Sequence, residues 1–169
     1  MSDEQLAQSK VKIIHIPTVL GAVVPAYNIP GVNAELKFAP DVLADIFLGK
    51  IDNWSNPRIA KENPGIKFPD QQIVVVHRSD GSGTNYIFTD YLSKVSPEWK
   101  STIGKGTSVS WKTGMGGKGN EGVAGYIRNI QGSIGYVELI YALQNKITYG
   151  MVRNSSGAYV KASLDSTTA

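Results

Sequence analysis

One short segment of the sequence combines several groups that bind oxyanions. It reads Arg78, Ser79, Asp80, Gly81, Ser82, Gly83 and Thr84. An arginine supplies a permanent charge on a planar fork that suits tetrahedral anions, and the serine and threonine side chains add hydroxyl donors. The glycines at 81 and 83 are expected to allow positive-φ turns and close approach of backbone N–H groups. Asp80 is expected to pair with Arg78 rather than face the anion.

The neighbouring residues predict where this segment lies. Residues 73–76 are four apolar, β-branched residues, and with His77 they predict a strand over 73–77 that is buried on both faces. Apolar residues then recur at helical spacing over 87–95. The segment therefore joins a strand to a helix N-terminus, whose free N–H groups and dipole favour anions. An ordinary turn, in which Ser82 or Thr84 only caps the helix, is the alternative.

Other chemistries find little support in the spacing of residues. None of the Gly-Lys pairs fits a phosphate-binding P-loop, and Gly114, Gly116 and Gly119 match a dinucleotide fingerprint only weakly. His15 and His77 are far apart, without carboxylates at metal-ligand spacing, and are expected to be structural. We expect no catalytic residue, no metal and no cofactor.

Composition narrows the class of protein. The chain has 169 residues, 41% of them apolar and 18% charged, which indicates one ordinary globular domain. A net charge of +3 gives little support to nucleic-acid binding. The absence of cysteine excludes disulfides and zinc-thiolate sites. Residues 13–29 contain a histidine and two prolines and do not resemble a membrane span, and the N-terminus lacks the features of a signal peptide.

Strands and helices are predicted to alternate along the chain. Helices are expected over 2–7, from 40 to 48, over 54–62, around 87–95, over 119–129 and over 138–145, and extended segments or strands over 11–16, 19–27, 73–77, 108–111, 133–137 and 148–152. The residues from 154 onward are expected to be a loose polar tail. This order predicts an α/β fold with a largely parallel sheet flanked by helices.

The segment from Arg78 to Thr84 resembles the RxDGSGT loop of the PstS family, the periplasmic phosphate-binding proteins of high-affinity phosphate ABC transporters. Further blocks resemble the family in the same order: residues 38–54, 91–99, 114–122 and 132–138. The resemblance extends over essentially the whole chain. It implies a non-enzymatic binding protein with a type II periplasmic-binding-protein fold, of which this chain is the second lobe.

The resemblance also implies a division of the chain. Residues 1–30 would be a remnant of the first lobe with a crossover strand, residues 31–153 the α/β second lobe, and residues 154–169 a tail leading back toward the first lobe. The first-lobe segments would lie upstream of this chain, and with them the acidic residue that accepts the proton of phosphate. We therefore expect weak phosphate binding with poor discrimination against sulfate.

Site residues and partners follow from the same resemblance. Arg78, Ser82, Gly83 and Thr84 would bind phosphate, and Asp80 would hold the guanidinium. The intact parent protein would be periplasmic and would deliver phosphate to the membrane permease. Two alternatives stay open: a fragment that self-associates through an apolar surface exposed over 19–29, and a small phosphatase-like enzyme with Ser82 as nucleophile.

Overall fold

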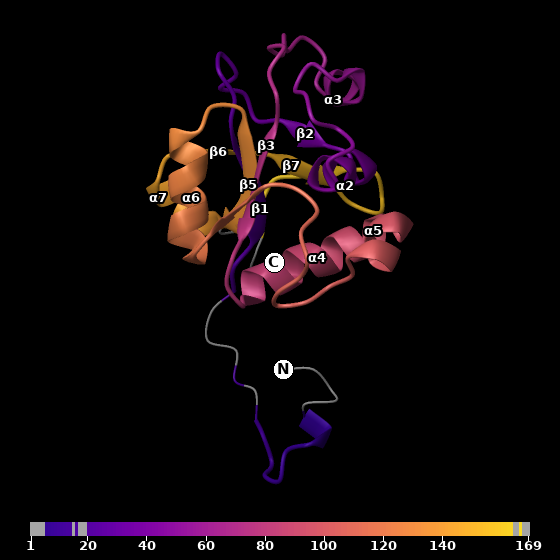
Figure 1. The fold of residues 1–169 in the computed structure, drawn as a ribbon, viewed down its shortest axis with the longest axis vertical. Helices are drawn as coiled ribbons and strands as arrows, with labels where there is room; N and C mark the ends of the chain where they lie inside the picture. The colour runs from indigo at the N-terminus through magenta and orange to yellow at the C-terminus, as the bar shows by residue number, and fades with distance from the viewer. Residues whose placement is uncertain (1–5, 15, 17–19, 164–165, 167–169) are drawn as a thin grey trace.

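A five-stranded sheet in the order β4-β3-β5-β1-β6 forms the centre of the fold, and a three-stranded sheet in the order β2-β7-β8 lies beside it (Figure 1). The computed structural model describes residues 6–14, 16, 20–163 and 166. The strands are β1 (Val23–Asn28), β2 (Lys37–Phe38), β3 (Val74–Arg78), β4 (Met115–Gly117), β5 (Ser133–Glu138), β6 (Thr148–Tyr149), β7 (Met151–Arg153) and β8 (Tyr159–Val160).

The strand directions of the larger sheet are mixed. β3 runs parallel to both of its neighbours, β4 and β5. β1 runs antiparallel to β5 and to β6, with Val23 opposite Glu138. β1 is thus the only strand of this sheet that opposes the common direction, which agrees with the predicted α/β fold but adds a reversed strand that the sequence did not predict.

Helices cover both faces of the larger sheet (Figure 1). The helices of the described residues are α2 (Pro40–Phe47), α3 (Pro57–Glu62), α4 (Gly83–Val95), α5 (Pro97–Thr102), α6 (Gly119–Asn129) and α7 (Leu139–Gln144), of which α2, α4, α6 and α7 cover the sheet. Because side chains of a strand alternate between faces, Val76 packs with the core under α6 and α7, whereas Val75 packs with the core under α2 and α4. The sheet is therefore buried on both faces, as the run of β-branched residues in β3 predicts.

The C-terminal strands differ from the sequence prediction. The prediction of a single strand over 148–152 is wrong, because these residues form two strands, β6 and β7, that belong to different sheets. Gly150 separates them and donates its N–H to the carbonyl of Pro25 at 2.9 Å. A Cβ at Gly150 would lie 2.6 Å from a ring carbon of Phe38, so the crossing point needs glycine. The tail is also more ordered than predicted, since β8 pairs with β7.

Other predicted elements shift or fail. The helix expected over 54–62 begins at Pro57, where the side chain of Asn56 caps it by accepting from the N–H of Arg58. The strand expected over 108–111 is wrong, because the Trp111 ring instead lies flat on the His77 ring at 4.7 Å between centroids. Most of the helix expected over 2–7 lies outside the described residues, and α5 was not predicted.

The exposed apolar side chains differ in part from those expected over 19–29. The prediction is correct for Leu20, which is 62% exposed, and wrong for β1, because Val24, Ala26 and Tyr27 are buried in the sheet. Further exposed apolar side chains lie earlier, at Val11 and Ile14, where 72% and 71% of the residue surface is accessible. Within the described ranges, the structure contains no helix of the length and apolarity that crossing a membrane requires.

The division of the chain at residues 30 and 153 stays a prediction. The pairing of β1 with β5 and β6 places residues 23–28 inside the sheet of the α/β lobe, and the pairing of β8 with β7 does the same for residues 159–160.

Candidate anion-binding site

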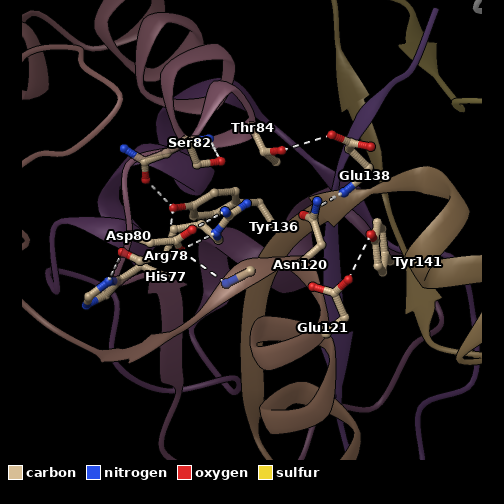
Figure 2. Close-up of polar contacts among 12 residues, drawn as sticks. His77, Arg78, Asp80, Ser82, Thr84, Asn120, Glu121, Tyr136, Glu138 and Tyr141 are labelled. Atoms are coloured by element: carbon tan, nitrogen blue, oxygen red, sulfur yellow. Dashed lines mark hydrogen bonds and ion pairs between the residues drawn. The ribbon is translucent and has the colours of Figure 1, made fainter. Parts of the chain in front are cut away.

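The candidate site lies where three neighbouring strands end. β4, β3 and β5 are parallel, so their carboxyl ends meet at one edge of the sheet. Arg78 ends β3, Glu138 ends β5, and α4 and α6 begin nearby (Figure 2). In open α/β sheets this is the edge at which ligands bind.

Arg78 and Asp80 form a two-point ion pair at this edge. Arg78 Nε donates to Asp80 Oδ1 at 2.8 Å and Nη2 donates to Oδ2 at 2.6 Å. Asp80 therefore faces Arg78 as expected. The Arg78 side chain is only 8% exposed, and its Nη1 group has no acceptor within the described part of the chain. The ion pair thus fixes a nearly buried guanidinium and leaves donors for an anion.

A second contact orients the carboxylate. The backbone N–H of Gly119, the first residue of α6, donates to Asp80 Oδ1 at 3.1 Å. The hydrogen bonds from Arg78 and from this N–H lower the pKa of Asp80 far below its usual range. The same contact with Asp80 raises the pKa of Arg78. The pair is therefore fully ionised at neutral pH.

The N-terminus of α4 provides backbone donors. Ser82 is its N-cap, and Ser82 Oγ accepts from the N–H of Asn85 at 3.3 Å. The N–H of Ser82 donates to the carbonyl of Thr107 at 2.9 Å. Among the described residues, no acceptor engages the N–H groups of Gly83 and Thr84, which point out of the first turn at the positive end of the helix dipole.

The role expected for the two glycines needs a correction. Neither Gly81 nor Gly83 has a positive φ. The loop does not need it, because an extended residue at Ser82 turns the chain into α4. A Cβ at either glycine would meet no other atom within 4 Å, so both border open space.

Thr84 and Glu138 connect the helix to the end of β5. Thr84 Oγ1 donates to Glu138 Oε1 at 3.1 Å (Figure 2). The backbone N–H of Glu138 donates to Asn120 Oδ1 at 3.3 Å, which ties this residue to the first turn of α6. The hydroxyl expected to bind an anion is therefore already engaged by a carboxylate in the structure.

The buried side chain of Tyr136 contacts the backbone of Arg78. Tyr136 of β5 accepts from the backbone N–H of Arg78 at 3.0 Å and donates to the side-chain carbonyl of Asn85. Its ring stacks on Phe88 with centroids 4.2 Å apart. Burial raises the pKa of Tyr136, so the hydroxyl keeps its proton. This contact joins the end of β3 to the start of α4.

The structure gives no support to a nucleophilic role for Ser82. His77 Nδ1 lies 3.1 Å from the carbonyl oxygen of Arg78, and its ring stacks on Trp111. Burial lowers the pKa of His77. His15 lies outside the described residues. Within the described ranges, acidic and histidine side chains form no group of three that could hold a metal ion.

Three contacts of the site were not predicted from the sequence. They involve Glu138, Gly119 and Tyr136, which lie far along the chain from the loop. The available signal was positional: Glu138 directly follows the strand predicted over 133–137 and begins a predicted helix, and Gly119 begins another predicted helix. Only the strand order β4-β3-β5 brings them to Arg78.

Comparison with known proteins identifies the family of this chain. A model of the PBP superfamily domain matches residues 1–169. The chain belongs to the PBP superfamily. It is 53% identical over 167 residues to phosphate-binding protein PstS of Pasteurella multocida, covering 98% of this chain and 48% of that protein. It is 51% identical over 169 residues to PstS of Xylella fastidiosa strain Temecula1, covering 98% and 46%. The resemblance to phosphate-binding proteins of the PBP superfamily is thereby confirmed.

Solved structures show the same fold. PstS from Borrelia burgdorferi superposes with a TM-score of 0.58 at 24% identity, covering 82% of this chain and 50% of that chain. The α/β fold of a PBP-superfamily lobe, expected from the sequence, is confirmed. The chain spans about half the length of the PstS relatives it matches.

Proposed function

We propose that this chain carries one half of a phosphate-binding site and acts as part of the substrate-binding component of a phosphate ABC transporter. The observation that carries the proposal is that Arg78, which ends β3, and the first turn of α4, which begins at Gly83, lie at the same edge of the sheet. Among the described residues, the Nη1 group of Arg78 and the backbone N–H groups of Gly83 and Thr84 have no acceptor. A fixed guanidinium and a helix N-terminus together are a strong site for an oxyanion. The relatives named above are phosphate-binding proteins, which favours phosphate as the anion.

In the complete protein, the first lobe would close over this edge of the sheet and supply the remaining donors. Closure would exclude water, and delivery to the membrane permease would follow reopening. A periplasmic location belongs to the same proposal. Ser82, Gly83 and Thr84 would contact the anion with Arg78, while Asp80 would hold the guanidinium in place.

The test is a calorimetric titration of the chain with phosphate at neutral pH and low salt. We expect weak, saturable binding that is lost in Arg78→Ala, because the mutant keeps neutral donors but loses the positive charge of the guanidinium. Arg128→Ala is the matched control, since Arg128 lies exposed in the last turn of α6, at the opposite end of the helix from the site. Equal phosphate affinity in wild type and Arg78→Ala would contradict the site.

Self-association is a second candidate property, supported by a separate observation. Val11, Ile14, Ile16 and Leu20 expose 72%, 71%, 76% and 62% of their surface. Extended apolar residues of this kind form intermolecular contacts unless another element covers them. Sedimentation velocity over a concentration series tests this property: we expect association that weakens when Ile14 and Ile16 are both replaced by serine, and a monomer at every concentration would contradict it.

A further inference from the structure

We propose that a groove between α4 and α5 is a docking surface that takes an acidic segment of a partner protein. The groove has a volume of about 650 Å³, and its charged lining residues are Asp90, Lys94, Lys100 and Lys105. We call it the lysine groove. Among the described residues it shares none with the loop from 78 to 84, so this inference goes beyond the proposed function and does not depend on it.

The charge of the lysine groove favours an acidic ligand. Asp90 pairs with Lys94 at 2.6 Å and with Lys105 at 2.7 Å, and these contacts lower the pKa of the carboxyl, which stays ionised at neutral pH. Lys100 makes no ion pair among the described residues, and Glu98 of α5 is engaged in an ion pair outside the groove. The single carboxylate of the groove therefore leaves most of its positive charge unbalanced.

The backbone that carries Lys105 is anchored on both sides. Gly104 has a φ of 74°, its N–H donates to the carbonyl of Trp99 at 2.9 Å, and its own carbonyl accepts from the Trp99 ring at 2.9 Å. The side-chain amide of Asn85 donates to the carbonyl of Gly106 at 2.9 Å. Because this backbone is already fixed, a ligand that binds Lys105 does not have to order it.

Tyr86 adds an aromatic surface at one end of the lysine groove. Lys105 Nζ lies 5.7 Å from the centroid of the Tyr86 ring, and Tyr86 is 40% exposed. Tyr86, Asp90 and Lys94 follow one another at a spacing of four residues in α4, so they share one face of the helix. A tyrosine combines apolar contact area with a polar hydroxyl, which suits a protein interface.

The exposure of the lysines favours a chain of carboxylates over a small anion. The side chains of Lys94 and Lys105 are 72% and 50% exposed. One ion pair at such exposure contributes little affinity, because water and salt screen it. A peptide with several carboxylates meets all three lysines at the cost of one association. Nucleic acid fits less well, since a single tyrosine does not provide repeated base stacking.

The experiment measures fluorescence anisotropy of a labelled oligoglutamate peptide at neutral pH and low salt. We compare wild type with two double variants, Lys100→Gln with Lys105→Gln in the groove and Lys61→Gln with Lys67→Gln as the matched control. The control lysines are exposed and lie on α3 and in the loop after it, well separated from α5 (Figure 1). Each double variant removes the same charge from the chain.

Wild type should bind the peptide, and added salt should weaken the binding. The groove variant should bind about tenfold more weakly, because it loses two of the three cations. The control variant should keep the wild-type affinity. Absence of binding in wild type, or equal affinities in wild type and the groove variant, would overturn the lysine groove as a docking surface.

The guanidinium of Arg78 is a second place at which carboxylates find a cation, and two measurements separate it from the groove. Arg78→Ala should bind the peptide as tightly as wild type. Amide chemical shifts of the ¹⁵N-labelled wild type, which need no variant, should change over α5 and residues 104–106 and stay unchanged over 78–84. Peptide binding that is lost in Arg78→Ala, or shift changes confined to 78–84, would contradict the proposal.

Competition identifies the kind of occupant. Pyrophosphate and a single-stranded oligothymidylate should displace the peptide only at much higher concentration. Pyrophosphate that competes as well as unlabelled peptide would overturn a protein segment as the occupant, and tighter binding of the oligothymidylate would do the same. Phosphate titration of the groove variant should match wild type, which keeps the outcome for the lysine groove separate from the outcome for the half-site.

Discussion

The backbone N–H of Arg78 donates to the hydroxyl of Tyr136 at 3.0 Å, so the position of Arg78 depends on a side chain from the neighbouring strand. The same hydroxyl donates to Asn85 in the first turn of α4. One buried group therefore sets the spacing between the guanidinium and the helix N-terminus.

Removing this hydroxyl should weaken both stability and anion binding. Tyr136→Phe leaves a buried N–H and a buried carbonyl without partners, which costs about 1–3 kcal/mol. Urea unfolding measures the loss, and phosphate titration measures the weaker affinity. Tyr126→Phe is the control, because Tyr126 is 40% exposed. A Tyr136→Phe chain as stable as wild type would show that Tyr136 does not hold the loop.

The ion pair between Arg78 and Asp80 predicts a pH-dependent contribution to stability. The pKa of Asp80 is lowered in the folded chain by Arg78 and the Gly119 N–H. The contribution is therefore present above the unfolded pKa of about 3.9 and is lost as the pH falls toward the folded value. Asp80→Asn should lower the melting temperature at pH ~7 and differ less from wild type at pH ~3.

The control for this titration is Asp52→Asn, since Asp52 is exposed and its side chain makes no hydrogen bond within the described residues. It should melt like wild type at both pH values. A difference between wild type and Asp80→Asn that grows on acidification would contradict the assigned ion pair.

Alanine substitutions at the two N-cap serines, Ser82 and Ser96, distinguish an effect on folding stability from an effect on phosphate binding. Ser82 caps α4 and Ser96 caps α5, each accepting from the backbone N–H three residues later. Replacing either by alanine should cost about 1 kcal/mol. Only Ser82→Ala should also weaken phosphate binding, because Ser82 keeps its hydroxyl hydrogen for the anion while its oxygen caps the helix. Equal phosphate affinities in the two variants would limit Ser82 to capping.

Two glycines near and within α6 should respond in opposite directions to alanine. A Cβ at Gly117 would lie 2.7 Å from the backbone nitrogen of Val123, so Gly117→Ala must push α6 away from β4 and is expected to cost about 1–3 kcal/mol. A Cβ at Gly125 meets nothing within 4 Å, and Gly125→Ala should stabilise the helix by about 0.5–1 kcal/mol. Thermal unfolding of both variants measures the difference in their stability. A Gly117→Ala chain as stable as Gly125→Ala would show that α6 does not pack this tightly on β4.

Local patterns predicted much of the fold. The apolar spacing after Pro40 predicted α2, and the bounds expected for α6 match those observed. β4 was missed because Met115–Gly117 is rich in glycine and forms a strand only through pairing with β3. The strand expected over 108–111 failed because Trp111 is used for ring packing with His77 instead of backbone pairing.

The contacts of the candidate site could also be predicted only in part from the sequence. The pairing of Arg78 with Asp80 could be predicted, because the two residues are close along the chain. The contact of Thr84 with Glu138 could not, since it depends on which strand lies next to β3. Contacts between residues close along the chain can be predicted from the sequence. Contacts that depend on the order of the strands in the sheet cannot.

The reversed strand β1 also bears on how the chain is synthesised. β1 pairs with β5 and β6, both of which lie near the C-terminal end of the chain. As the chain leaves the ribosome, β1 emerges long before either partner, and pairing over such sequence separations is slow. The apolar strand β1 therefore stays without its two sheet partners until the residues of β5 and β6 have also been made.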